Sequence, residues 1–173
     1  TVSVSAVNAC GTSAATAATT CAASHTQPRR RGTWLATLAA ALLLAGSASA
    51  QVDVTASAGT PNATYPTLKD AFDAINAGTH QAVITIAITG DTTETAPAVL
   101  NASGSGSALY TSIGISPSGG AARTISGAIA AGSPLIDLNG ADNVTIDGLN
   151  SGGNSLTISN TTVAATSGTS TIR

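Results

Sequence analysis

The amino-acid sequence predicts an all-β protein made of short strands, on three observations. Of the 173 residues, only 8% are charged and 2% are aromatic, and Ala, Thr, Ser and Gly are abundant, which argues against long charged helices or a coiled coil. From residue 82 onward, apolar and polar side chains alternate with a period of two, as in strands with one buried face. Turn signals rich in Gly, Asn and Pro separate the alternating segments.

The charge of the chain argues against a nucleic-acid partner. Six basic and eight acidic side chains give a net charge of −2, so no broad cationic surface can neutralise a nucleic-acid backbone. Residues 51–173 alone carry three basic and eight acidic side chains, a net charge of −5. No nucleic-acid partner is therefore expected, and a sparse acidic surface suits a secreted protein.

A signal peptide is predicted at residues 29–50. Three adjacent arginines at 29–31 are followed by an uncharged run rich in Leu and Ala at 34–45. About a dozen residues fit the roughly 7 to 15 of a signal-peptide core and fall short of the roughly 20 needed to span a bilayer. Small residues end the segment at Ala50, which predicts cleavage before Gln51. The membrane would then be contacted only through this segment, during export.

Residues 1–28 form a leader whose origin the sequence leaves open. They are interpreted either as disordered or as the remnant of a module, because residues 4–13 resemble the closing strands of immunoglobulin-like, PKD-like modules. A folded module should not precede a signal peptide, so the chain is expected to be a fragment. Cys10 and Cys21 are interpreted as thiols without a disulfide. The alternative to cleavage is a core helix or a membrane anchor retained at residues 33–50.

The segment after the cleavage site is expected to begin with a strand and one helix. Residues 51–57 alternate apolar and polar side chains and predict the strand. Residues 67–78 predict the helix, with Thr67 as N-cap, Asp70 in the capping-box position and Gly78 at the end. Its apolar stripe has the spacing i, i+3, i+4 and i+7 and is expected to lie on a core. The stripe consists of Leu68, Ala71, Phe72 and Ile75.

The strands that follow are regularly spaced. The centres Ile125, Ile136, Ile146 and Ile158 are 11, 10 and 12 residues apart, which indicates a repeat. Taken two at a time they predict a coil of about 21 or 22 residues, as in a right-handed parallel β-helix. An antiparallel β-sandwich shows turn signals at similar intervals, so the spacing leaves both folds open. Further strands are expected at 84–88, 113–115, 136–138, 144–146, 156–158 and 171–173.

Two segments resemble the pectin-lyase-like β-helix proteins. Residues 65–75 are similar to the strand-then-helix opening of that family, in which an amphipathic helix covers the first coil. Residues 135–149 resemble its coil of the type "Asn-Val-Thr-Ile-Asp-Gly". The resemblance implies a right-handed parallel β-helix over residues 51–173, with a short N-terminal capping helix and an incomplete C-terminal end. It also implies the N-terminal portion of a large bacterial surface or adhesin-type repeat protein.

No catalytic or cofactor-binding residue is predicted. Asp137, Asp142 and Asp147 recur at intervals of five and are the only calcium candidates. They are interpreted as solvated turn residues, because calcium takes six to eight oxygen ligands and no dense cluster surrounds them. His80 is interpreted as a surface or capping residue.

The function predicted from these observations is structural or adhesive. The protein is expected to be secreted or displayed on the outer bacterial cell surface, where ladders of Thr, Ser, Asn and Asp would contact glycans or the surfaces of host or neighbouring cells. The alternative is a polysaccharide lyase or glycoside hydrolase whose catalytic coils lie beyond the fragment, because this fold hosts enzymes and adhesins alike.

Overall fold

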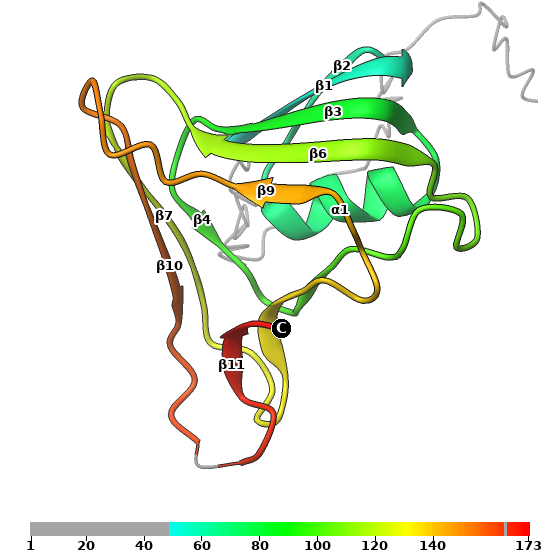
Figure 1. Cartoon of the computed structure of the whole chain (residues 1–173). Helices are drawn as coiled ribbons and strands as arrows, with labels where there is room; N and C mark the ends of the chain where they lie inside the picture. Colours follow the sequence, from blue (N-terminus) through cyan, green and yellow to red (C-terminus); the bar gives the residue numbers. More distant parts are fainter. Residues whose placement is uncertain (1–48, 165) are drawn as a thin grey trace, which may run out of the picture. The chain divides into compact units, whose positions relative to one another are not determined.

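Strands dominate the computed structural model, which describes residues 49–164 and 166–173 (Figure 1). This part of the chain contains one helix and eleven strands, and the strands form a mixed five-stranded sheet and two three-stranded sheets. The all-β prediction is therefore confirmed. The predicted leader, its cysteines and the predicted signal peptide up to residue 48 lie outside the described residues. Among the residues described, no helix is long and apolar enough to cross a membrane.

The five-stranded sheet begins with an antiparallel hairpin. Strand β1 (Val52–Gly59) pairs with β2 (Asn62–Tyr65) on one side and with β3 (His80–Ile88) on the other. Gly59 ends β1 at φ 75°, and a Cβ there would lie 2.5 Å from the carbonyl oxygen of Thr79. The sequence does not predict β2, because its residues are exposed or half-buried and show no apolar alternation.

Helix α1 (Leu68–Asn76) confirms the helix predicted from the sequence. The Thr67 side chain accepts a hydrogen bond from the Asp70 amide at 3.1 Å, and its hydroxyl donates to the Asp70 carboxylate at 2.7 Å. Gly78 follows the helix at φ 76°. The four stripe residues are fully buried, so the helix covers the core through the face that the spacing predicts.

Three successive segments of three strands each place one strand in each of three sheets. Within each sheet, strands from successive segments pair in parallel. The first segment contains β3, β4 (Thr92–Thr93) and β5 (Ala98–Val99). The second contains β6 (Tyr110–Pro117), β7 (Ala122–Gly127) and β8 (Pro134–Asp137). The third contains β9 (Val144–Ile146), β10 (Ser155–Asn160) and β11 (Ser170–Ile172).

This pairing corrects two expectations. Because antiparallel pairing between the described strands is confined to β1 with β2 and β3, the alternative of an antiparallel β-sandwich is wrong. Ile86, Ile115 and Ile146 are register partners 29 and 31 residues apart, so the coil of about 21 or 22 residues is also wrong. Each segment contains three strands, whereas the even spacing of the strand centres does not indicate how many strands make up one turn.

The core lies between the three sheets and beneath α1. The helix contacts β1, β2, β3 and β5. The Asn76 amide donates to the Val99 carbonyl at 2.8 Å, and the Asn76 side-chain oxygen accepts from the Asn101 amide at 3.0 Å, which ties the end of the helix to β5. The first segment is thereby covered on the side away from the second segment.

Candidate functional site

The three aspartates considered as calcium ligands have separate surroundings. Asp137 forms an ion pair with Arg173 at 2.6 Å, and Asp147 accepts a hydrogen bond from the Leu149 amide at 2.8 Å. Asp142 is exposed. Among residues 49–164 and 166–173, no group of three or more His, Cys, Asp or Glu side chains is placed to hold a metal. Each carboxylate therefore has a local surrounding of its own.

His80 is fully buried at the start of β3, so its interpretation as a surface residue is wrong. Its Nδ1 lies 2.7 Å from the Thr60 carbonyl oxygen and its Nε2 lies 2.7 Å from the Tyr65 hydroxyl. A carbonyl only accepts, so Nδ1 carries the proton and Nε2 accepts from Tyr65. Burial raises the pKa of Tyr65, which keeps that hydroxyl protonated as a donor. The imidazole thus holds the β1–β2 hairpin against β3, with both nitrogens occupied.

Glu94 is a second buried polar group that the sequence does not reveal. It lies between β4 and β5, is 1% exposed, and accepts from the backbone amides of Leu68 at 3.0 Å and Lys69 at 3.1 Å. A carboxylate at a helix N-terminus satisfies amides that have no partner within the helix and interacts favourably with the helix dipole. Glu94 therefore anchors α1 to the first segment.

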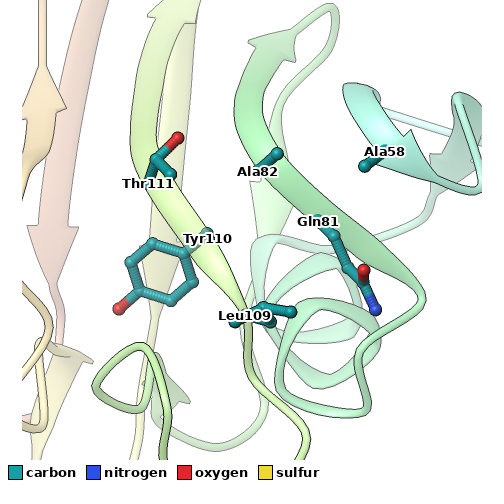
Figure 2. A pocket seen from close by; sticks show the side chains of 6 residues that line it. All are labelled: Ala58, Gln81, Ala82, Leu109, Tyr110 and Thr111. Atoms are coloured by element: carbon teal, nitrogen blue, oxygen red, sulfur yellow. The ribbon is translucent and has the colours of Figure 1, made fainter.

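An apolar pocket of about 280 Å³ lies at one end of the five-stranded sheet, where β3 and β6 begin (Figure 2). It forms where the pairing of β3 with β6 is irregular, next to Ala82 at φ 64°. Its two largest polar groups point elsewhere, since the Gln81 amide donates to the Gly78 carbonyl and the Tyr110 hydroxyl donates to the Asn101 carbonyl. The lining consists of Ala58, Gln81, Ala82, Leu109, Tyr110 and Thr111. The pocket is therefore an apolar cavity with few polar groups free to bind a ligand.

The outer face of the five-stranded sheet carries one uncharged residue from each strand in a single row. We call this set the threonine row, and all its members are exposed except the half-buried glycine. Neighbours in the row are register partners, so they are about 4.8 Å apart along the sheet. From β2 to β9 the row consists of Asn62, Thr55, Thr85, Gly114 and Thr145.

A groove of about 390 Å³ lies at the hairpin end of this face. Four polar side chains line it, together with Val54 and Ala63, and we call it the β1–β2 groove. The polar residues stand in two register pairs, so their Cβ atoms are about 5 Å apart within each pair. Within the described part of the chain, none of the four side chains makes a hydrogen bond to another protein group. The pairs are Asp53 with Thr64 and Thr55 with Asn62.

No protein-family model, curated protein or solved structure matches this chain. The β1–β2 groove is the candidate site because it combines a cavity with unengaged hydrogen-bonding groups. It brings together one carboxylate, one amide and two hydroxyls that the sequence leaves unconnected. The sequence does not predict this site because it does not predict β2. Only the β1–β2 hairpin places Asn62 and Thr64 beside Thr55 and Asp53.

Proposed function

We propose that residues 51–173 form the capped N-terminal end of a right-handed parallel β-helix with a structural or adhesive role outside the cell. The observation that carries this proposal is the register, in which three successive segments stack strand on strand in three sheets. Crossovers between parallel strands are right-handed in about 98% of cases, which supports the proposed hand.

Side-chain hydrogen bonds between successive segments support the stacking of one segment on the next. The Asp91 carboxylate accepts from the Thr124 amide, 33 residues away, at 2.8 Å. The Asn139 amide donates to the Asn101 side chain, 38 residues away, at 3.1 Å. Such links between successive repeats are expected of a solenoid, in which each repeat contacts its neighbours. Helix α1 then acts as the cap that covers the apolar edge of the first repeat.

An adhesive role is supported by the outer face of the five-stranded sheet. The threonine row presents hydroxyl and amide groups on strands that are already paired in the sheet, so little ordering is needed on binding. The β1–β2 groove adds a carboxylate to the same face. We propose glycans or the surfaces of host or neighbouring cells as the partners of this face.

Binding and turnover measured together test the role. The purified 173-residue chain is incubated with insoluble polysaccharides and with bacterial cells, and retention is measured by pull-down, with bovine albumin as the control protein. Retention without release of unsaturated or reducing-end products is expected. Product release from pectic polysaccharides would instead support the alternative of a polysaccharide lyase or hydrolase, and absence of retention on every surface would contradict adhesion.

Export is tested separately by the mature N-terminus. Ala50 is exposed, and the Gln51 amide donates to the Tyr65 carbonyl at 2.9 Å, so the proposed cleavage point immediately precedes the sheet. Expression in a bacterium followed by mass spectrometry of the medium is expected to give a chain that begins at Gln51. Full-length chain retained in the membrane fraction would favour the alternative of a retained anchor.

A further inference from the structure

We infer that the β1–β2 groove is a binding subsite for saccharides that carry no acidic group. This inference rests on the proposed adhesive function and adds the class of ligand and the place where it binds. The volume of about 390 Å³ lies within the roughly 300 to 1,000 Å³ of small-molecule sites.

The groups that line the groove match a sugar ring. The Asp53 carboxylate is an acceptor for two hydroxyl groups, the Asn62 amide both donates and accepts, and the threonine hydroxyls do the same. The polar side chains have no hydrogen-bond partner among the described residues, so a ligand need not displace one.

The charges around the groove select against acidic sugars. Asp53 is the one charged side chain that lines it, and its register partners in the neighbouring strands are the uncharged Thr64 and Ala87. The carboxylate of a uronate in the groove would face the Asp53 carboxylate with no cation between them. Like charges repel at short range, so a uronate should bind poorly. An amino sugar would instead bring its ammonium group to Asp53.

The basic residues of the described chain are engaged elsewhere. Lys69 pairs with Asp73 on α1, and Arg173 pairs with Asp137. The Arg123 guanidinium donates to the Ser118 carbonyl at 3.0 Å. None of the three lines the groove, so a ligand that bears carboxylates finds no partner there.

The groove continues into the threonine row. Thr55 belongs to both, and its register partner in β3 is the exposed Thr85. A chain of sugars seated in the groove can therefore extend over the next strands. Tetrasaccharides are expected to bind more tightly than the corresponding monosaccharides.

The test is an NMR titration of the ¹⁵N-labelled 173-residue chain with three probes: cellotetraose, a glucosamine tetramer and tetragalacturonate. We expect amide shift changes centred on the β1–β2 groove with the first two probes, tighter binding for the glucosamine tetramer, and no change with tetragalacturonate. Asp53→Asn should weaken binding of the glucosamine tetramer about tenfold, since a charge-assisted hydrogen bond is worth about 1.4 kcal/mol more than a neutral one.

The matched control is Asp73→Asn, which removes the same charge from α1, outside the groove. It should leave binding of all three probes unchanged. Since the Asp53 side chain makes no hydrogen bond to another described group, Asp53→Asn should fold as the parent does, which the ¹⁵N spectrum itself verifies.

The outcomes separate this inference from the proposed function. Shift changes in the groove with tetragalacturonate, or changes with cellotetraose confined to other strands, would overturn the inference while adhesion to glycans stands. Equal effects of the two asparagine variants would overturn the role of Asp53 and with it the inference. No response to any probe, together with no retention in the pull-down, would overturn the inference and the adhesive function alike.

Discussion

The third strand segment places the same kinds of residue at the same register positions as the first two segments, yet buries them less. Ile86 in β3 is fully buried and Ile115 in β6 is 2% exposed, whereas their partner Ile146 in β9 is only half-buried. In another sheet, Ile136 is fully buried and its partner Ile172 is 41% exposed. Residue type and register are shared, so neither explains the difference.

The neighbouring layers explain it. The first segment lies between the second segment and the cover formed by α1, β1 and β2, while the third segment is packed against the second alone among the described residues. Apolar burial in this architecture therefore depends on having a layer on both sides. Changes at the covered end should cost more than equivalent changes in the third segment, and the following predictions test that in order of decreasing effect.

The largest effect is expected at Phe72, the biggest fully buried side chain of α1. Phe72→Ala should lower the free energy of unfolding by about 3 to 5 kcal/mol, because it removes buried apolar surface and leaves a cavity beneath the cover. Chemical denaturation followed by circular dichroism measures this. Phe72→Leu, which keeps most of the volume, is the control and should cost clearly less, and equal losses for the two variants would contradict tight packing of the helix.

The second prediction compares register partners directly. Ile136→Ala should cost roughly 2 to 5 kcal/mol, as for a fully buried isoleucine. Ile172→Ala removes a side chain that is 41% exposed and should cost about 1 kcal/mol. The two variants are matched in chemistry and sheet, so a similar loss for both would show that the third segment is covered after all.

The sequence allows the helix and most of the longer strands to be predicted, but not their grouping. The capping residues and apolar stripe of α1 are local signals, and the alternation around Ile86, Ile115 and Ile146 marks one face of each strand. The two-residue strands β4 and β5 carry no such signal, and the even spacing of the other strand centres fits two strands per turn as well as the three that the structure has.

The candidate site is harder to predict from the sequence than the helix is, because it forms across a hairpin. Asp53 and Thr55 lie on a predicted strand, but their partners Asn62 and Thr64 belong to a hairpin that residue patterns do not show. The sequence does not reveal the burial of His80 and Glu94, because their partners are 15 and 26 residues away, in contacts that only the fold creates. Helix caps and apolar alternation can be predicted from neighbouring residues, whereas hydrogen bonds between polar groups far apart in the sequence cannot.

A third prediction concerns the link between the cover and the first segment. Glu94→Gln should destabilise the fold by about 1.5 to 3 kcal/mol, because it replaces a buried carboxylate that accepts two helix amides with a neutral group that has only one acceptor oxygen. Thermal unfolding at pH 7 measures the loss. Glu94→Asp retains the charge with a shorter reach, and a loss for Gln smaller than that for Asp would contradict a role for both oxygens.

The smallest effect is expected at alkaline pH, where tyrosines from the cover and from the second segment can be compared. Burial raises the pKa of Tyr65, and burial followed by the charge of Asp142 raises the pKa of Tyr110. The unfolded chain loses these protons near the ordinary value of about 10, whereas the folded chain retains them. Their contribution to stability is therefore complete below about pH 10 and is lost as the pH rises through the folded values.

Unfolding midpoints measured from pH 8 to 11 should fall above about pH 10, and Tyr65→Phe and Tyr110→Phe should each flatten that fall. Tyr65→Phe should also lower stability at pH 7, because it leaves the buried Nε2 of His80 without its donor. Lys69, whose pKa is raised by its hydrogen bond to Asp73, titrates in the same range but is solvated, so Lys69→Gln is the control and should change the slope least. If Lys69→Gln flattened the curve as much as the tyrosine variants do, the loss of stability at alkaline pH would come from surface charge. Deprotonation of the two tyrosine hydroxyls would then not be its cause.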